Sequence, residues 1–152
     1  MWYSQYDKRW AKEKLGLSQL NIAGYGCTIT SIANWLSFFG IVATPHDVNQ
    51  KLIEVKGFAF DKYGNQCLVI WERVQKAFPQ MKHIKRVPNY NNIEVAWWIY
   101  VKKTPVLVEV AIKGGRHWVL YIGGQKLVDP LTGGVRYTSV YTPTGYSLFS
   151  KI

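Results

Sequence analysis

Apolar residues in the first hundred positions recur at helical spacing. Ile29, Ile32, Ala33, Leu36 and Phe39 lie three or four residues apart, and Gly40 follows them. This pattern predicts an amphipathic helix that stops at Gly40. The same reasoning predicts three more helices: one that starts at Thr44-Pro45, carries Val48 and Leu52 and ends near Gly57; one through Ile70, Trp71, Val74, Ala77 and Phe78, stopped by Pro79; and one that starts after Asn91 or Asn92 and carries Ile93, Ala96, Trp97 and Tyr100.

The period of the pattern changes to two in the last third of the chain. Residues 106–112 alternate in the manner of a strand, and residues 117–122, 126–129 and 146–149 are further strand candidates. Glycine-rich turns at 114–115 and 123–125 separate them. Helices followed by hairpin-linked strands predict an α+β fold with helices packed on a C-terminal antiparallel sheet. We expect residues 1–152 to form one domain.

Composition supports a packed core and free thiols. The chain has 152 residues, of which 48% are hydrophobic, enough for a core without disulfide bridges. Its two cysteines, Cys27 and Cys67, follow an N-terminus without the apolar run of a signal peptide. We therefore expect free thiols and synthesis in the cytoplasm. No apolar stretch is long enough to predict a transmembrane segment.

The formal net charge of +10 points toward anionic partners. Nineteen Lys and Arg outnumber nine Asp and Glu, and they are scattered along the chain. A spread positive field attracts nucleic acid, anionic membrane surfaces or the anionic polymers of a bacterial wall, although solubility alone explains it equally well. Nucleic acid is the weaker candidate because no basic-aromatic motif of a known reader occurs.

The sequence predicts no cofactor. Its two cysteines and three histidines lack the close pairs that zinc sites use, so no metal site is expected. Gly123-Gly124 and Gly133-Gly134 lack the lysine and hydroxyl context of a phosphate-binding loop.

Cys27 is the candidate nucleophile. It precedes the first predicted helix, where unpaired backbone N–H groups and the positive end of the helix dipole favour a thiolate. Gly26 beside it would leave room for a substrate, and Tyr25, Gly26 and Trp118 are the expected substrate contacts. The competing interpretation is that Cys27 is a small buried core residue.

His117 is the candidate base among three histidines. His46 falls in the first turn of a helix, and His83 lies among basic residues. If the turn after residue 122 comprises the three residues 123–125, Val119 faces Asp129, and His117 projects on the same side as that carboxylate. A two-residue turn would place them on opposite faces. Asp129 would then fix the imidazole tautomer, unless Asp129-Pro130 only opens a turn.

An oxyanion donor completes such a site. The backbone N–H of Cys27 is one candidate, and a side-chain amide usually complements it. Gln5, Gln19 and Asn21 all precede the cysteine, and their residue types do not distinguish them.

Five segments together resemble the papain-like cysteine peptidases, in the branch of the bacteriocin-processing (double-glycine leader) peptidases. They are YSQYDKRW (3–10), GYGCTITSIANWLSFFG (24–40), TPHDVNQKL (44–52), RHWVLYIGG (116–124) and LVDPLTGG (127–134). The resemblance implies a papain-like fold with Cys27 as nucleophile, His117 as base and acid, Asp129 as orienting residue and Gln5 as oxyanion donor. The bacteriocin processors attach this domain to a membrane transporter, and we expect no such part within these 152 residues.

Two substrate classes fit this activity. One is bacterial cell-wall peptidoglycan, as for a bacteriophage endolysin, which reaches the wall after a lesion in the host membrane. The net charge suits that anionic wall. The other is a protein or leader peptide that is processed by cleavage. A catalytically inactive binding module and a basic polyanion-binding protein are the alternatives outside the enzymes.

Overall fold

The computed structural model describes residues 1–152, which form five helices, eight strands and one short 3-10 turn. The helices are α1 (Ile22–Tyr25), α2 (Cys27–Phe38), α3 (Pro45–Glu54), α4 (Trp71–Ala77) and α5 (Asn92–Tyr100). The strands are β1 (Phe58–Phe60), β2 (Gln66–Val69), β3 (Met81–Val87), β4 (Val106–Ile112), β5 (Gly115–Gly123), β6 (Lys126–Asp129), β7 (Gly134–Tyr137) and β8 (Thr142–Lys151), with the 3-10 turn η1 (Thr138–Val140) before β8.

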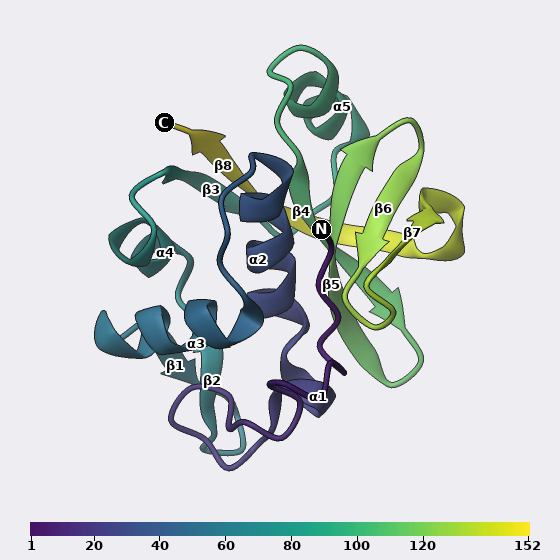
Figure 1. The fold of residues 1–152 in the computed structure, drawn as a ribbon. Helices are drawn as coiled ribbons and strands as arrows, with labels where there is room; N and C mark the ends of the chain where they lie inside the picture. The colour runs from purple at the N-terminus through teal and green to yellow at the C-terminus, as the bar shows by residue number, and fades with distance from the viewer.

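Six strands form one antiparallel sheet in the order β3-β8-β4-β5-β6-β7. The last strand in sequence, β8, lies between β3 and β4, whereas β4 to β7 are joined by successive hairpins. β1 and β2 form a separate two-stranded sheet. Figure 1 shows α2 crossing in front of the large sheet, with α3, β1 and β2 below and to its left and α5 at the upper end of the molecule. The predicted α+β architecture with an antiparallel sheet is confirmed.

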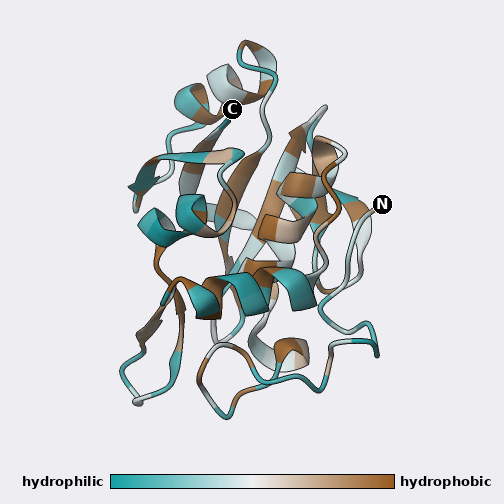
Figure 2. Ribbon diagram, turned by 60° about the vertical axis from the view of Figure 1, so that its left-hand side comes forward, coloured by the Kyte–Doolittle hydropathy of each residue, from teal (hydrophilic) through white to brown (hydrophobic).

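α2 provides the larger of two hydrophobic clusters. Ile29, Ile32 and Trp35 are fully buried, and they pack with Leu120 and other strand residues in a core of 21 buried side chains. The Ser31 hydroxyl donates a 3.0 Å hydrogen bond to the backbone carbonyl of Trp118, which fixes α2 against β5. Figure 2 shows hydrophobic colour along the central strands and hydrophilic colour along the outward side of the helices and the loops.

A smaller cluster lies on the other face of the sheet, beneath α5. Val95 and Trp98 of α5 pack on Val119 and Tyr121 of β5 in a group of ten buried residues. Alternation along the middle of β5 explains the division, since Val119 and Tyr121 face α5 whereas Trp118 and Leu120 face α2.

Two of the predicted helix starts, at Thr44 and Asn91, are confirmed by their caps. The Thr44 hydroxyl accepts from the Asp47 N–H, and the Asp47 carboxylate accepts from the Thr44 N–H, so both halves of a capping box are present. The Asn91 side chain caps α5. Gly40 follows α2 with a φ of +75°, the left-handed conformation that terminates helices. Sequence reasoning missed α1, β1, β2, β3 and β7, and the last strand extends well beyond the predicted 146–149.

The turn between β5 and β6 differs from the prediction, but the register does not. The turn comprises two residues, Gly124 and Gln125, because Gly123 pairs with Lys126. A register shift between Tyr121 and Gly123 then inserts one residue, so that Tyr121 pairs with Leu127. A two-residue turn alone would place His117 and Asp129 on opposite faces of the sheet. The bulge adds one residue and so restores the predicted register.

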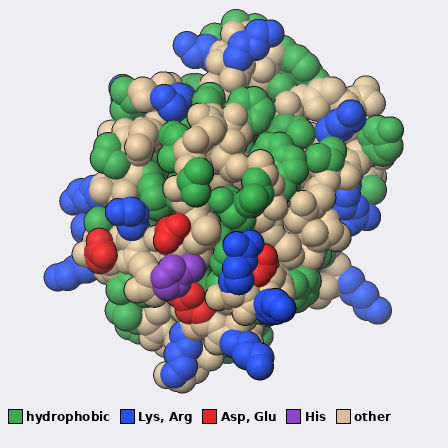
Figure 3. Space-filling view, in the orientation of Figure 1, with side chains coloured by type: hydrophobic (Ala, Val, Ile, Leu, Met, Phe, Trp, Pro, Cys, Tyr) green, Lys and Arg blue, Asp and Glu red, His purple; other side chains and the backbone are tan.

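Basic side chains are spread over the surface. Figure 3 shows Lys and Arg at many separate places on one face of the molecule, with a few acidic side chains among them. None of the helices combines the length and the apolar character that crossing a membrane requires.

Candidate active site

Cys27 is the first residue of α2, as the sequence predicts. The short helix α1 ends at Tyr25, and only Gly26 separates the two helices. The backbone N–H of Cys27 donates to no acceptor within the protein, as is usual for the first position of a helix. The sulfur therefore lies beside a free N–H and the positive end of the α2 dipole.

His117 and Asp129 are in contact. β5 pairs with β6 only from Gly123 back to Leu120, so the beginning of β5 extends past the end of β6. Where β5 extends past β6, the imidazole Nε2 of His117 lies 2.9 Å from Oδ1 of Asp129. The His117 side chain is 3% exposed and that of Asp129 is fully buried. The carboxylate therefore fixes the ring orientation and holds a proton on Nε2.

The same imidazole reaches Cys27. Because Nε2 is engaged by Asp129, Nδ1 is the nitrogen left for the thiol. Burial lowers the pKa of His117, but hydrogen bonds to Asp129 and to Cys27 outweigh burial and raise the pKa to about 9. The arrangement thus favours a protonated imidazole in the groove where Cys27 begins α2.

Asp129 has two further partners that the sequence did not indicate. The Tyr141 hydroxyl donates a 2.6 Å hydrogen bond to Oδ2, and Arg136 lies 3.1 Å from the same oxygen. The Leu131 N–H donates to Oδ1 at 3.0 Å. Burial raises the pKa of Asp129, but the hydrogen bonds from His117, Tyr141 and the Leu131 backbone outweigh burial and hold the pKa well below its usual range. The carboxylate therefore stays ionised in the core.

Gln5 is the one of the three candidate amides that lies beside Cys27. Its Nε2 donates a 2.8 Å hydrogen bond to the Ala23 carbonyl in α1, and its backbone N–H donates to Pro130 O at 2.7 Å, just after β6. The side chain is 2% exposed and borders the same groove as Cys27. Gln19 is exposed, and the Asn21 side chain caps α1 by accepting from Gly24 N–H. One N–H of the Gln5 amide remains free for a ligand.

The three expected substrate contacts have different roles in the structure. Tyr25 is 59% exposed and Trp118 is 9% exposed, and both border the groove. Gly26 does not border it. A Cβ at Gly26 would lie 2.6 Å from the Ile22 carbonyl oxygen, so the packing of α1 against α2 requires a residue without a side chain here.

The groove around Cys27 and His117 has a volume of about 680 Å³. One wall is aromatic: the rings of Trp71 and Trp118 lie 4.8 Å apart, and the Arg86 guanidinium covers Trp118 at 4.9 Å. Arg86 also pairs with Glu109 at 3.2 Å. Sequence reasoning missed this wall apart from Trp118, because its residues come from α4, β3 and β4, far apart in the chain.

Cys67 also borders the groove, from β2. Its thiol lies 3.7 Å from the Asp61 carboxylate. Burial and then the negative charge of Asp61 raise the pKa of the Cys67 thiol. The two cysteines of the groove therefore differ in environment: Cys27 faces an imidazole and Cys67 a carboxylate.

The other histidines lie away from the groove. His46 pairs with Glu13 at 2.6 Å on the surface, and this hydrogen bond raises its pKa. His83 packs on Phe149, and burial lowers its pKa. No three His, Cys, Asp or Glu side chains converge where they could hold a metal ion.

No protein-family model, curated protein or solved structure matches the chain.

Proposed function

We propose that the chain is a cysteine-dependent hydrolase of the papain-like kind, which cleaves an amide or peptide bond through Cys27, His117 and Asp129. The observation that carries the proposal is the arrangement of the three side chains: Asp129 holds Nε2 of His117 at 2.9 Å, and His117 borders the same groove as Cys27, whose proximity helps to raise the His117 pKa. A histidine that only filled the core would not need both a buried carboxylate and a thiol in an open groove.

The reaction proceeds by acyl transfer. The Cys27 sulfur attacks the substrate carbonyl carbon, an S–C bond forms, and the carbonyl oxygen becomes negative. The free N–H groups of Cys27 and Gln5 stabilise that oxygen. His117 gives its proton to the amine nitrogen, and the C–N bond breaks. Water then adds to the thioester while His117 takes its proton, and the S–C bond breaks to release the acid.

Asp129 acts through His117. Its carboxylate keeps the ring oriented with Nδ1 toward Cys27, and it stabilises the imidazolium. Tyr141 and Arg136 hold the carboxylate in turn, since both bind the oxygen that His117 does not use. A protonated Asp129 would lose this set of hydrogen bonds, so the network keeps the carboxylate charged.

Bacterial cell-wall peptidoglycan is the proposed substrate. The net charge of +10 is spread over the surface and suits an anionic wall, and the groove combines aromatic rings with Arg86 and Arg116, which suits a peptide stem that carries carboxylates. An enzyme of the endolysin kind, made in the cytoplasm and acting on the wall after a membrane lesion, would have these properties. Processing of a protein or leader peptide is the outcome that the test below distinguishes.

The test is digestion of purified sacculi from a Gram-positive and a Gram-negative species, with released fragments identified by mass spectrometry and the Cys27→Ala protein as control. We expect fragments with a new amine and a new carboxyl terminus that the Cys27→Ala protein does not release. Intact sacculi of both kinds under reducing conditions between about pH 5 and 9, a range that extends up to the His117 pKa of about 9, would overturn the wall assignment.

A further inference from the structure

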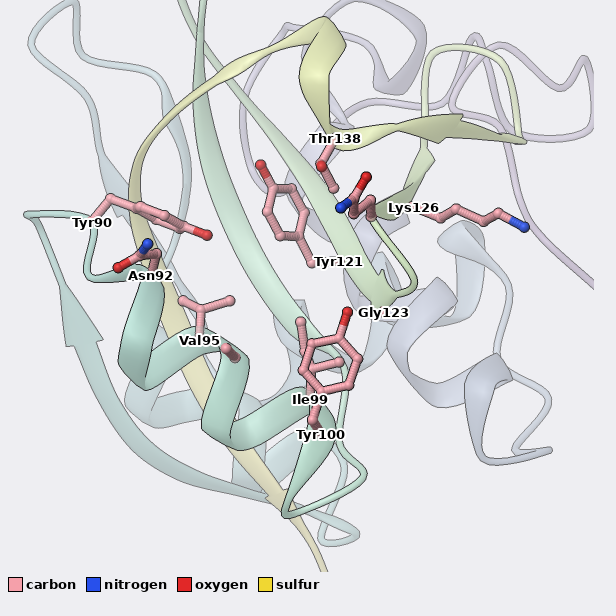
Figure 4. A pocket seen from close by; sticks show the side chains of 11 residues that line it. Tyr90, Asn92, Val95, Ile99, Tyr100, Tyr121, Gly123, Lys126 and Thr138 are labelled. Atoms are coloured by element: carbon pink, nitrogen blue, oxygen red, sulfur yellow. The ribbon is translucent and has the colours of Figure 1, made fainter.

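A second cavity lies on the α5 face of the sheet, between α5 and the β5–β6 hairpin. It has a volume of about 150 Å³ and shares no lining residue with the groove of Cys27. Figure 4 shows Asn92 and Val95 of α5 on the left, Tyr121 in the centre, Thr138 above it and Tyr100 below it.

Tyrosine rings form much of its wall. Tyr90 meets Tyr121 edge to face with ring centroids 6.4 Å apart, and Tyr100 closes the end toward the hairpin. Val95 and Ile99 supply an aliphatic floor. Such faces pack against the C–H groups of a small ligand and exclude water from them.

The polar groups around this wall are left without partners. Tyr121 is 6% exposed, yet its hydroxyl has no hydrogen bond within the protein, and the hydroxyl borders the cavity. The polar groups of Tyr90, Asn92, Gln125 and Thr138 also have no side-chain hydrogen bond within the protein. The Tyr121 hydroxyl oxygen is itself accessible at the cavity surface, so it is open to a hydrogen bond from a ligand or from water.

The cavity has no charge directed into it. Lys126 is the only charged lining residue, and Figure 4 shows its side chain directed away from the cavity. Burial raises the pKa of Tyr121, so its hydroxyl keeps its proton and remains a donor at neutral pH. A neutral ligand that offers several hydroxyl or amide groups fits this set, whereas an ion does not.

The cavity wall is held in place by the fold. The Gly124 N–H donates a 2.9 Å hydrogen bond to the Tyr100 hydroxyl, and the Thr138 N–H donates to Gln125 O at 2.8 Å. Gly123, with a φ of +96°, brings the hairpin so close that a Cβ there would lie 3.0 Å from a methyl carbon of Ile99. The site is therefore formed before any ligand binds.

We propose that this cavity binds one ring of a neutral saccharide. A sugar ring presents C–H groups on its faces and hydroxyl groups around its edge, which matches tyrosine walls rimmed by free hydroxyl and amide groups. The volume is below the roughly 300–1,000 Å³ of pockets for larger ligands, so one ring is accommodated. A neighbouring hollow shares Ile99, Tyr100 and Gly123 with the cavity, which leaves a path for the next ring of a chain.

The proposal does not depend on hydrolysis, so its test uses Cys27→Ala protein. Amide NMR spectra are recorded with the N-acetylglucosamine tetrasaccharide and with maltotetraose, which separates N-acetylated from plain glucose rings. We expect saturable shifts at Asn92, Gly123 and Gln125 with at least one of them, at millimolar affinity. Shifts confined to Thr28 and Trp118 in the groove, or no shifts up to about 10 mM, would overturn the proposal.

Variants locate the binding more sharply. Removing the free hydroxyl in Tyr121→Phe should weaken binding about three- to tenfold, since the ring stays and one hydrogen bond is lost. Asn92→Ala, at an exposed position whose change should not disturb folding, should weaken it by a similar factor. Gln80→Ala, an exposed amide outside the cavity, is the matched control. Unchanged binding in both Tyr121→Phe and Asn92→Ala would contradict the proposal.

Discussion

The polar side chains at the two ends of strand β5 differ in whether they have a partner within the protein. His117 and Tyr121 are four residues apart on the strand, and both residues are at least nine-tenths buried. His117 has its partners within the protein, Asp129 and Cys27. Tyr121 has no partner for its hydroxyl. The comparison teaches that hydrogen bonds within the protein fix the orientation of a polar side chain such as His117, whereas the Tyr121 hydroxyl beside the cavity stays open to a ligand or to water.

The largest expected effect is the loss of hydrolysis when the His117 end is changed. His117→Ala and Cys27→Ala should each lower the rate of wall hydrolysis by at least about 10⁴-fold, because each removes one half of the nucleophile and base pair. His46→Ala is the matched control, since His46 lies on the surface and pairs with Glu13. Initial rates of fragment release measure this. Equal rates in His117→Ala and His46→Ala would contradict a role for His117 in hydrolysis.

The next effect concerns the oxyanion donor. Gln5→Ala should lower the rate by about 10²- to 10³-fold, because the side-chain N–H that is free for the substrate oxygen is lost. Gln19→Ala changes an exposed amide of the same type and should stay within about twofold of the parent rate. Circular dichroism checks that Gln5→Ala is folded. A folded Gln5→Ala enzyme at full rate would remove Gln5 from the mechanism.

A pH effect on stability should separate His117 from uncharged core residues. The folded-state pKa of His117 is raised from 6.5 to about 9, so its stabilising contribution is full below pH 6.5 and is lost as the pH rises through about 9. The free energy of unfolding in urea should therefore fall between these values by on the order of 1–3 kcal/mol. The decline should be smaller in His117→Gln protein. An equal decline in both proteins would mean that titratable groups other than His117 cause the loss of stability.

The smallest effects compare two tyrosines directly. Tyr141→Phe removes a hydrogen bond to the buried Asp129 carboxylate and should cost about 1.5 kcal/mol of unfolding free energy. Tyr121→Phe removes a hydroxyl without a partner and should change that free energy by less than about 0.5 kcal/mol. Urea unfolding of both variants at pH 7 gives the difference. Equal losses would mean that the Tyr121 hydroxyl is satisfied within the protein after all.

The sequence predicted what local signals encode. Four helices followed from apolar spacing, and two of their starts from caps at Thr44 and Asn91. The register that brings His117 to Asp129 could be counted along a short hairpin, although the bulge between Tyr121 and Gly123 was not foreseen. Cys27 could be proposed as the nucleophile because the apolar spacing predicts a helix that begins there.

The rest depended on tertiary contacts without a local pattern. β3 was missed because its basic residues, which suit an edge strand, hide the alternation. Tyr141 and Arg136 reach Asp129 only when β7 and the segment before β8 close over it. Gln5 borders the groove of Cys27 because its backbone N–H donates a hydrogen bond to the carbonyl of Pro130, a residue far from it in the sequence. Such contacts have no spacing that could be read in advance.

The most direct test of the central claim compares the two cysteines of the groove. Wild-type protein and His117→Ala protein are treated with iodoacetamide at about pH 6, below the His117 pKa of about 9, and peptide mapping by mass spectrometry follows each thiol. We predict that Cys27 is alkylated at least about tenfold faster than Cys67 in the wild-type protein, and that this advantage disappears in His117→Ala. Equal rates for the two thiols, or a Cys27 rate independent of His117, would contradict an activated cysteine.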